Sequence, residues 1–183
     1  MSHIDWIKDV PVAHRGYHDM NKQIWENTLS AFSRAIEAGF AIECDIQLSA
    51  DSVPMVFHDH DLQRLCGIAG EVRERTAAEL RMLSIGGTAD RIPTLRQMLD
   101  LVKGQVPLVI ELKGTDAEQD DGFVEAVLEV LEGYEGKVAL MSVAVALAAW
   151  HRRAFLPRLS ESQVRARFWR LMLVDVGALV AVM

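Results

Sequence analysis

Two histidines and a group of carboxylates are the residues of this sequence whose types and positions could do chemistry together. His14 and His58 each follow a short apolar run, and Glu43 and Asp45 lie within another. Two imidazoles can share general-acid and general-base catalysis, and clustered carboxylates can bind a hard divalent cation. Either histidine taken alone could be structural or solvated, but together with the carboxylates they favour phosphate-ester chemistry.

The run from Ile42 to Ile46 gives the clearest argument. Side chains alternate across a strand, so Glu43 and Asp45 share one face while apolar residues occupy the other. Two carboxylates that face inward repel each other and are costly to desolvate unless a cation or strong donors join them. The alternative interpretation is a pair of acids at a solvated strand end.

The run from Pro107 to Lys113 repeats this pattern, because Glu111 and Lys113 share a face. A third carboxylate would give Mg²⁺ or Ca²⁺ an oxygen shell that water and substrate complete. Lys113 and Arg15 would offer cations for phosphate oxygens. The structural alternatives are a buried ion pair between Glu111 and Lys113, and a surface salt bridge for Arg15.

Strand-like runs alternate with helical patterns up to about residue 141. Strands are expected at 10–13, 40–46, 53–57, 106–112 and 137–141, and helices at 28–39, 71–83 in part, 94–102 and 117–131. Strands that are apolar on both faces are typical of a parallel sheet covered by helices. No glycine-rich nucleotide fingerprint follows the first strand, and polar residues recur at the strand ends. We therefore favour a (β/α) barrel over an open doubly wound sheet.

The length of the chain is at odds with a complete barrel, which usually takes about 250 residues and eight strands. The chain has 183 residues, and only about five strands are recognisable before residue 142. From residue 143 onward the composition changes to six arginines against two acids. We expect an incomplete TIM-type (β/α) barrel over residues 1–142 and a divergent arginine-rich tail over 143–183, frame-shifted or poorly ordered.

Composition limits the partners and the location. The net charge of −7 gives no reason to expect nucleic acid as a partner. Cys44 and Cys66 need no disulfide and the N-terminus lacks a signal-peptide pattern, so we expect a cytoplasmic protein. The apolar run from Leu171 to Met183 contains Asp175 and is too short to span a bilayer. A homo-oligomer could cover the open edge of an incomplete barrel.

Across residues 10–142 the sequence resembles the glycerophosphodiester phosphodiesterase family. Six motifs carry the resemblance, in order: Ala13-His14-Arg15-Gly16, Glu26-Asn27-Thr28 followed by Ala31-Phe32, Glu43-Cys44-Asp45, His58-Asp59, Ile92-Pro93-Thr94-Leu95 and Glu111-Leu112-Lys113. The resemblance implies a TIM-barrel hydrolase that uses a divalent cation, commonly Mg²⁺ or Ca²⁺. Such an enzyme would convert a glycerophosphodiester, a small molecule, into glycerol 3-phosphate and an alcohol.

The resemblance also implies roles for individual residues. Glu43, Asp45 and Glu111 would be metal ligands, and His14 and His58 would be the acid and the base. Arg15 and Lys113 would bind the phosphate, and Glu26 would support the site. Beyond Met141-Ser142 the sequence departs from the family pattern. Two alternatives stay open. One is a catalytically impaired remnant that acts, if at all, by associating with another chain. The other is a related barrel phosphodiesterase that acts on lysophospholipids.

Overall fold

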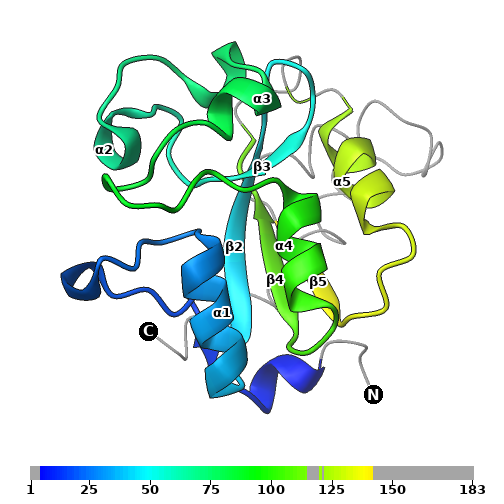
Figure 1. Ribbon diagram of the computed structural model, residues 1–183. Helices are drawn as coiled ribbons and strands as arrows, with labels where there is room; N and C mark the ends of the chain where they lie inside the picture. The colour runs from blue at the N-terminus through cyan, green and yellow to red at the C-terminus, as the bar shows by residue number, and fades with distance from the viewer. Residues whose placement is uncertain (1–4, 115–119, 121, 142–183) are drawn as a thin grey trace, which may run out of the picture.

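The computed structural model describes residues 5–114, 120 and 122–141, which are built around one sheet (Figure 1). Four parallel strands lie side by side in the order β1 (Val12–Ala13), β2 (Ala41–Leu48), β4 (Leu108–Leu112) and β5 (Val138–Met141). Each parallel strand is added on the same side of the one before it. A doubly wound sheet would reverse this order at its switch point, so the order favours the predicted (β/α) barrel type.

Helices lie in the connections between the parallel strands: α1 (Leu29–Ala38), α4 (Leu95–Val102) and α5 (Phe123–Leu131). Thr28 caps α1 by accepting a hydrogen bond from the N–H of Ala31, and Gly39 ends it with a φ of 70° that glycine adopts without a Cβ clash. Thr94 and Gln97 form a capping box at the start of α4. These capping residues therefore set the ends of α1 and the start of α4, which confirms the helices predicted at 28–39 and 94–102.

The two faces of β2 differ as alternation predicts. Ile42, Cys44 and Ile46 are fully buried in an apolar core that includes residues of α1, α4 and α5. Figure 1 shows α1 and α4 covering the near side of the sheet. The acids of β2 point to the other face, which leaves that face for polar contacts.

The strand predicted at 53–57 is present as β3 (Pro54–Val56), but it pairs antiparallel with β2. A parallel pair needs a crossover of about a dozen residues, and the connection from Leu48 to Pro54 is too short for one. The parallel arrangement expected from strand composition therefore does not extend to β3. Because β3 returns along β2, the N–H of Phe57 donates to the carbonyl of Asp45 at 2.9 Å. The return brings His58 back to the level of the acids.

Residues 57–92, here called the side segment, form a loop-rich region above the sheet in Figure 1. Its short elements are α2 (Gln63–Cys66), η3 (Val72–Glu74) and α3 (Ala77–Leu80), so the partly helical prediction for 71–83 is confirmed. The segment has a core of its own that includes Leu62, Leu65 and Leu80. This second core fixes the side segment beside the end of β3.

Two short 3-10 helices, η1 (Asp5–Lys8) and η2 (Met20–Lys22), complete the described elements. Within the described ranges no helix is long and apolar enough to cross a membrane. Three predictions lie outside the described residues. These are the domain boundary after residue 142, the tail over 143–183, and residues 117–119 and 121 of the helix predicted at 117–131.

Candidate active site

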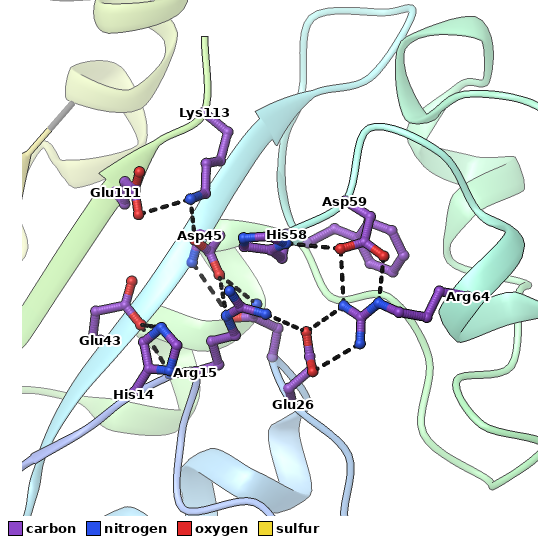
Figure 2. A network of polar contacts seen from close by, with 12 residues as sticks. His14, Arg15, Glu26, Glu43, Asp45, His58, Asp59, Arg64, Glu111 and Lys113 are labelled. Atoms are coloured by element: carbon purple, nitrogen blue, oxygen red, sulfur yellow. Dashed lines mark hydrogen bonds and ion pairs between the residues drawn. The ribbon is translucent and has the colours of Figure 1, made fainter. Parts of the chain in front are cut away.

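Three carboxylates from adjacent parallel strands converge on the polar face of the sheet. Glu43 and Asp45 lie on β2, and Glu111 lies on β4 opposite Asp45 in the register. One carboxylate oxygen of each lies within 4.8 Å of the other two. The side chains of Glu43 and Asp45 are 2% and 1% exposed, whereas that of Glu111 is 19% exposed. Figure 2 shows the three predicted ligands close together, and Glu111 is the most exposed of them.

The buried acids are only partly compensated. Glu43 accepts a hydrogen bond from the backbone N–H of Arg15 at 2.9 Å. Burial, and then the charge of Asp45, raise the pKa of Glu43 to about 8. Among the described residues, Oδ1 of Asp45 is buried without a hydrogen bond of good geometry, and its one close cation is Nζ of Lys113 at 3.2 Å. A hard divalent cation fits this set, because it binds several carboxylate oxygens at once and offsets their repulsion.

Two basic side chains border the carboxylates. The Nζ of Lys113 lies 2.9 Å from Glu111 and 3.2 Å from Asp45. Desolvation acts to lower the pKa of Lys113, but the hydrogen bond to Glu111 and the charge of Asp45 outweigh it and raise the pKa. The guanidinium of Arg15 places Nε 3.4 Å from Asp45 and Nη1 2.8 Å from Glu26. Both predicted phosphate-binding side chains therefore lie at the carboxylates, where they already serve as counter-charges.

The loop that carries His14 and Arg15 has an unusual backbone. Arg15 has a φ of 54°, a region that residues other than glycine seldom enter and that clusters at functional sites. Gly16 follows with a φ of 81°, and a Cβ there would lie 2.9 Å from side-chain atoms of Ala31 and Phe32 on α1. Glycine therefore allows this loop to pack against α1, which directs the Arg15 backbone N–H at the site.

The loop before α1 explains the motif Glu26-Asn27-Thr28. Asn27 is fully buried at a φ of 55°, which asparagine tolerates better than most residues, and its Nδ2 donates to Oδ2 of Asp45 at 2.9 Å. Glu26 accepts a hydrogen bond from Arg15, and Thr28 caps α1. Three consecutive residues therefore hold a predicted phosphate-binding arginine, a predicted metal ligand and a helix start.

The two predicted proton-transfer residues have different surroundings. His14 is 66% exposed, and its Nε2 lies 3.9 Å from Glu43, too far for a hydrogen bond. Partial burial of the ring, and then the charge of Arg15, lower the pKa of His14, which favours the neutral ring. The Nδ1 of His58 lies 2.7 Å from Oδ1 of Asp59. Because a carboxylate only accepts, this contact assigns the hydrogen to Nδ1 of the neutral ring of His58.

Gln47, which was not among the predicted site residues, fixes the loop that carries His58. It is the third polar residue on the same face of β2 as Glu43 and Asp45. Its Nε2 donates to the carbonyl oxygens of Phe57 at 3.0 Å and Asp59 at 2.6 Å. The continued alternation along β2 was the available signal for its position.

Arg64, on α2, was also not singled out. Its Nε donates to Oδ2 of Asp59 at 2.6 Å, and its Nη2 donates to Oε1 of Glu26 at 2.7 Å. Hydrogen bonding from Arg64, opposed by burial and aided by His58, lowers the pKa of Asp59 to about 2. Burial acts to raise the pKa of Glu26, but the hydrogen bonds from Arg64 and Arg15 lower it overall. No local pattern marks Arg64, because its position depends on how the side segment folds.

All eight predicted site residues therefore lie in one network of polar contacts (Figure 2), linked by residues for which no role was predicted. The linking residues are Asp59 and Arg64, with support from Asn27 and Gln47. The contacts bring the residues together, and the role of each remains a prediction.

The raised pKa of Glu43 predicts a pH dependence of stability in the absence of divalent cations. Between the ordinary value of 4.5 and about 8, folded Glu43 keeps a proton that the unfolded chain releases. The contribution of Glu43 to stability therefore falls as the pH rises through this window, by up to about 1.4 kcal/mol per pH unit. Glu43→Gln removes the titration, so we expect the variant to gain stability relative to the wild type as the pH rises.

Urea denaturation in chelator, at several pH values across this window, measures the difference in the free energy of unfolding. Glu37→Gln, at an exposed position of α1, is the matched control and should run parallel to the wild type. A difference between wild type and Glu43→Gln that stays constant across the window would contradict the raised pKa.

A family model described as the glycerophosphoryl diester phosphodiesterase family matches residues 14–156. A glycerophosphodiester phosphodiesterase of Caldanaerobacter subterraneus subsp. tengcongensis is 36% identical over 115 residues, which are 58% of this chain and 46% of that protein. One of Bacillus altitudinis is 33% identical over 132 residues, 67% of this chain and 52% of the relative. The chain thus spans about half the length of the curated relatives that it matches.

Solved structures show the same likeness. A glycerophosphodiester phosphodiesterase from Thermotoga maritima is 36% identical, with a TM-score of 0.60 over 73% of this chain and 54% of that one. An Oleispira antarctica phosphodiesterase in complex with the product sn-glycerol-3-phosphate is 25% identical, with a TM-score of 0.69 over 86% of this chain and 72% of that one. These likenesses confirm the predicted fold, of which the described sheet is an incomplete barrel.

Proposed function

We propose that this chain, which belongs to the glycerophosphoryl diester phosphodiesterase family, is a metal-dependent hydrolase of glycerophosphodiesters. Its products would be glycerol 3-phosphate and an alcohol. The observation that carries the proposal is the convergence of three carboxylates, two basic side chains and two histidines at one site. Because the chain covers only about half of its curated relatives, the activity is a proposal for this chain itself.

Glu43, Asp45 and Glu111 would hold the divalent cation, and a hard ion such as Mg²⁺ or Ca²⁺ matches their oxygen ligands. When bound, the cation would neutralise a non-bridging phosphate oxygen and lower the pKa of a hydroxyl. Asn27 would orient the Asp45 carboxylate by its hydrogen bond to Oδ2, and the backbone N–H of Arg15 would orient that of Glu43.

Arg15 and Lys113 would bind the remaining phosphate oxygens. Arg15 offers a planar fork of donors that suits a phosphate, and Lys113 offers a point charge. Both are already turned toward the carboxylates by ion pairs of 3.4 Å or less with Asp45. The phosphate group would therefore lie where the carboxylates and these two cations meet.

His14 and His58 would divide the two proton transfers. One imidazole takes the proton of the attacking hydroxyl as its oxygen bonds to phosphorus, and the other gives a proton to the leaving alkoxide as its bond to phosphorus breaks. The attacking hydroxyl belongs to water or to the glycerol group of the substrate, which would first form a cyclic phosphate. Asp59 would stabilise the imidazolium form of His58 through the 2.7 Å contact at Nδ1.

The product in the Oleispira antarctica structure, sn-glycerol-3-phosphate, supports this substrate class. A lysophospholipid substrate and a catalytically impaired remnant are the competing proposals.

We also propose a cytoplasmic location, which the free cysteines Cys44 and Cys66 support. Self-association that covers β1 and β5, at the edges of the described sheet, is a further proposal.

Release of glycerol 3-phosphate from glycerophosphocholine by the purified chain tests the proposal. With Mg²⁺ or Ca²⁺ we expect turnover, and with excess chelator we expect it to fall to background and return when the cation is restored. Lysophosphatidylcholine, assayed in parallel for choline and lysophosphatidic acid, should be cleaved more slowly. Faster cleavage of the lysophospholipid would make lysophospholipids the substrate class in place of glycerophosphodiesters. Folded protein without any turnover would favour the catalytically impaired remnant.

A further inference from the structure

Arg64 contacts both acids that lie beside the predicted phosphate-binding and proton-transfer residues. We propose that Arg64 is a positioning residue, which holds Asp59 and Glu26 in place and thereby orients His58 and Arg15. The consequence for turnover rests on the function proposed above, whereas the positioning itself can be measured without it. Figure 2 shows the guanidinium of Arg64 between the two carboxylates.

The contact of Arg64 with Asp59 is a two-point one. Nε donates to Oδ2 at 2.6 Å and Nη2 donates to Oδ1 at 2.9 Å, so both carboxylate oxygens are held. The same Oδ1 is the atom that meets Nδ1 of His58 at 2.7 Å. Since two parallel hydrogen bonds fix the plane of a carboxylate, Arg64 aims Oδ1 of Asp59 at the imidazole.

The contact of Arg64 with Glu26 also uses both oxygens. Nη1 donates to Oε2 at 3.0 Å and Nη2 donates to Oε1 at 2.7 Å. Oε1 accepts in addition from Nη1 of Arg15 at 2.8 Å. Glu26 is only 5% exposed, so its charge depends on these two guanidinium groups for compensation. If Arg64 were lost, Arg15 would be left to compensate the charge of Glu26 without it.

Glu26, His58 and Asp59 themselves have ligand atoms close enough to hold a metal ion. Arg64 already neutralises both acids of this group, so a cation there would have to displace the guanidinium. The guanidinium of Arg64 therefore suits this group better than a second metal ion would.

The fold of the side segment determines where Arg64 lies. Its neighbours Leu62 and Leu65 are 0% and 2% exposed and belong to the core of that segment, whereas the Arg64 side chain is 46% exposed. The backbone is thus anchored on the buried side while the side chain reaches back to the site. The packing of the side segment therefore determines where the guanidinium of Arg64 lies relative to Asp59 and Glu26.

Lysine cannot replace this geometry, because an ammonium is a point charge and has no planar fork for two carboxylates. We therefore expect Arg64→Lys and Arg64→Ala to release Asp59 from its fixed plane. His58 would then lose the acceptor that selects the Nδ1–H tautomer, and a mixture containing Nε2–H would form. If the proposed function holds, turnover should fall on the order of 10- to 100-fold, the usual effect of removing a residue that orients another.

The test is ¹⁵N NMR of the histidine side chains in the full chain, in chelator and at a pH where the ring of His58 is neutral. The signal of His58 among the six histidines is assigned from a His58→Gln sample. Wild type and Arg96→Ala, a control at an exposed position of α4, should both show a hydrogen on Nδ1. Arg64→Lys and Arg64→Ala should shift the population toward Nε2–H.

Turnover and rescue provide the second readout. Guanidinium ion, added to Arg64→Ala below denaturing concentrations, should restore part of both the tautomer and the turnover, and ammonium ion should not. An unchanged Nδ1–H signal in folded Arg64→Lys would overturn the positioning role, whatever the activity. A changed tautomer in a chain without phosphodiesterase turnover would keep that role and reject only the proposed function.

Discussion

Asp45→Asn is expected to lower the kcat for glycerophosphocholine by at least about 10²–10³-fold at saturating Mg²⁺ or Ca²⁺. Asp45 is 1% exposed and contacts Asn27, Arg15 and Lys113 at 3.4 Å or less. Asparagine keeps the shape of the side chain but removes the charge that both the cation and the basic residues require. The effect on kcat should exceed the effect on KM, because charge compensation matters most as the phosphate reacts.

The fold should survive this substitution. Lys113 keeps its 2.9 Å contact with Glu111, and Arg15 keeps its 2.8 Å contact with Glu26. Asp100→Asn makes the same chemical change at an exposed position of α4 and is the matched control. Equal turnover by Asp45→Asn and Asp100→Asn, with both folded as judged by circular dichroism, would remove Asp45 from the chemistry.

Replacing either histidine with alanine is expected to lower the kcat by about 10²–10⁴-fold, the range of general acid–base catalysis. The two losses should respond differently to the leaving group. A p-nitrophenyl ester of glycerol phosphate releases a phenolate that needs no proton, so the variant that lacks the general acid should regain most of its activity on it. The variant that lacks the general base should not, because the attacking hydroxyl still has to lose its proton.

Comparison of glycerophosphocholine with the p-nitrophenyl ester, for His14→Ala and His58→Ala, therefore assigns the acid and the base in one experiment. His60→Ala is the control, since His60 is exposed and two residues from His58. A loss that is the same on both substrates for both variants would contradict the division of the proton transfers between His14 and His58.

Much of the site could be predicted because it depends on local geometry. Alternation along a strand requires Glu43 and Asp45 to share a face, and parallel pairing of β2 with β4 brings Glu111 opposite Asp45. The caps of α1 and α4 were predictable for the same reason, since Thr28 and Thr94 bond within one helical turn.

The remainder depends on tertiary structure. The antiparallel return of β3 could have been inferred from the short connection after Leu48, but its effect, which is to bring His58 level with Asp45, needs the actual register. Arg64 was not predictable, because its reach to Glu26 spans 38 residues and depends on how Leu62 and Leu65 pack in the side segment. Long-range contacts of this kind leave no periodic pattern in the sequence.

Calorimetric titration of Mg²⁺ and Ca²⁺ measures whether Glu43, Asp45 and Glu111 form the proposed divalent-cation site within this chain. We predict one bound ion per wild-type chain, unchanged binding in Asp100→Asn and binding weakened at least about tenfold in Asp45→Asn, as a lost carboxylate ligand requires. Folded wild-type protein that binds neither ion, or that binds no better than Asp45→Asn, would contradict a divalent-cation site at these carboxylates.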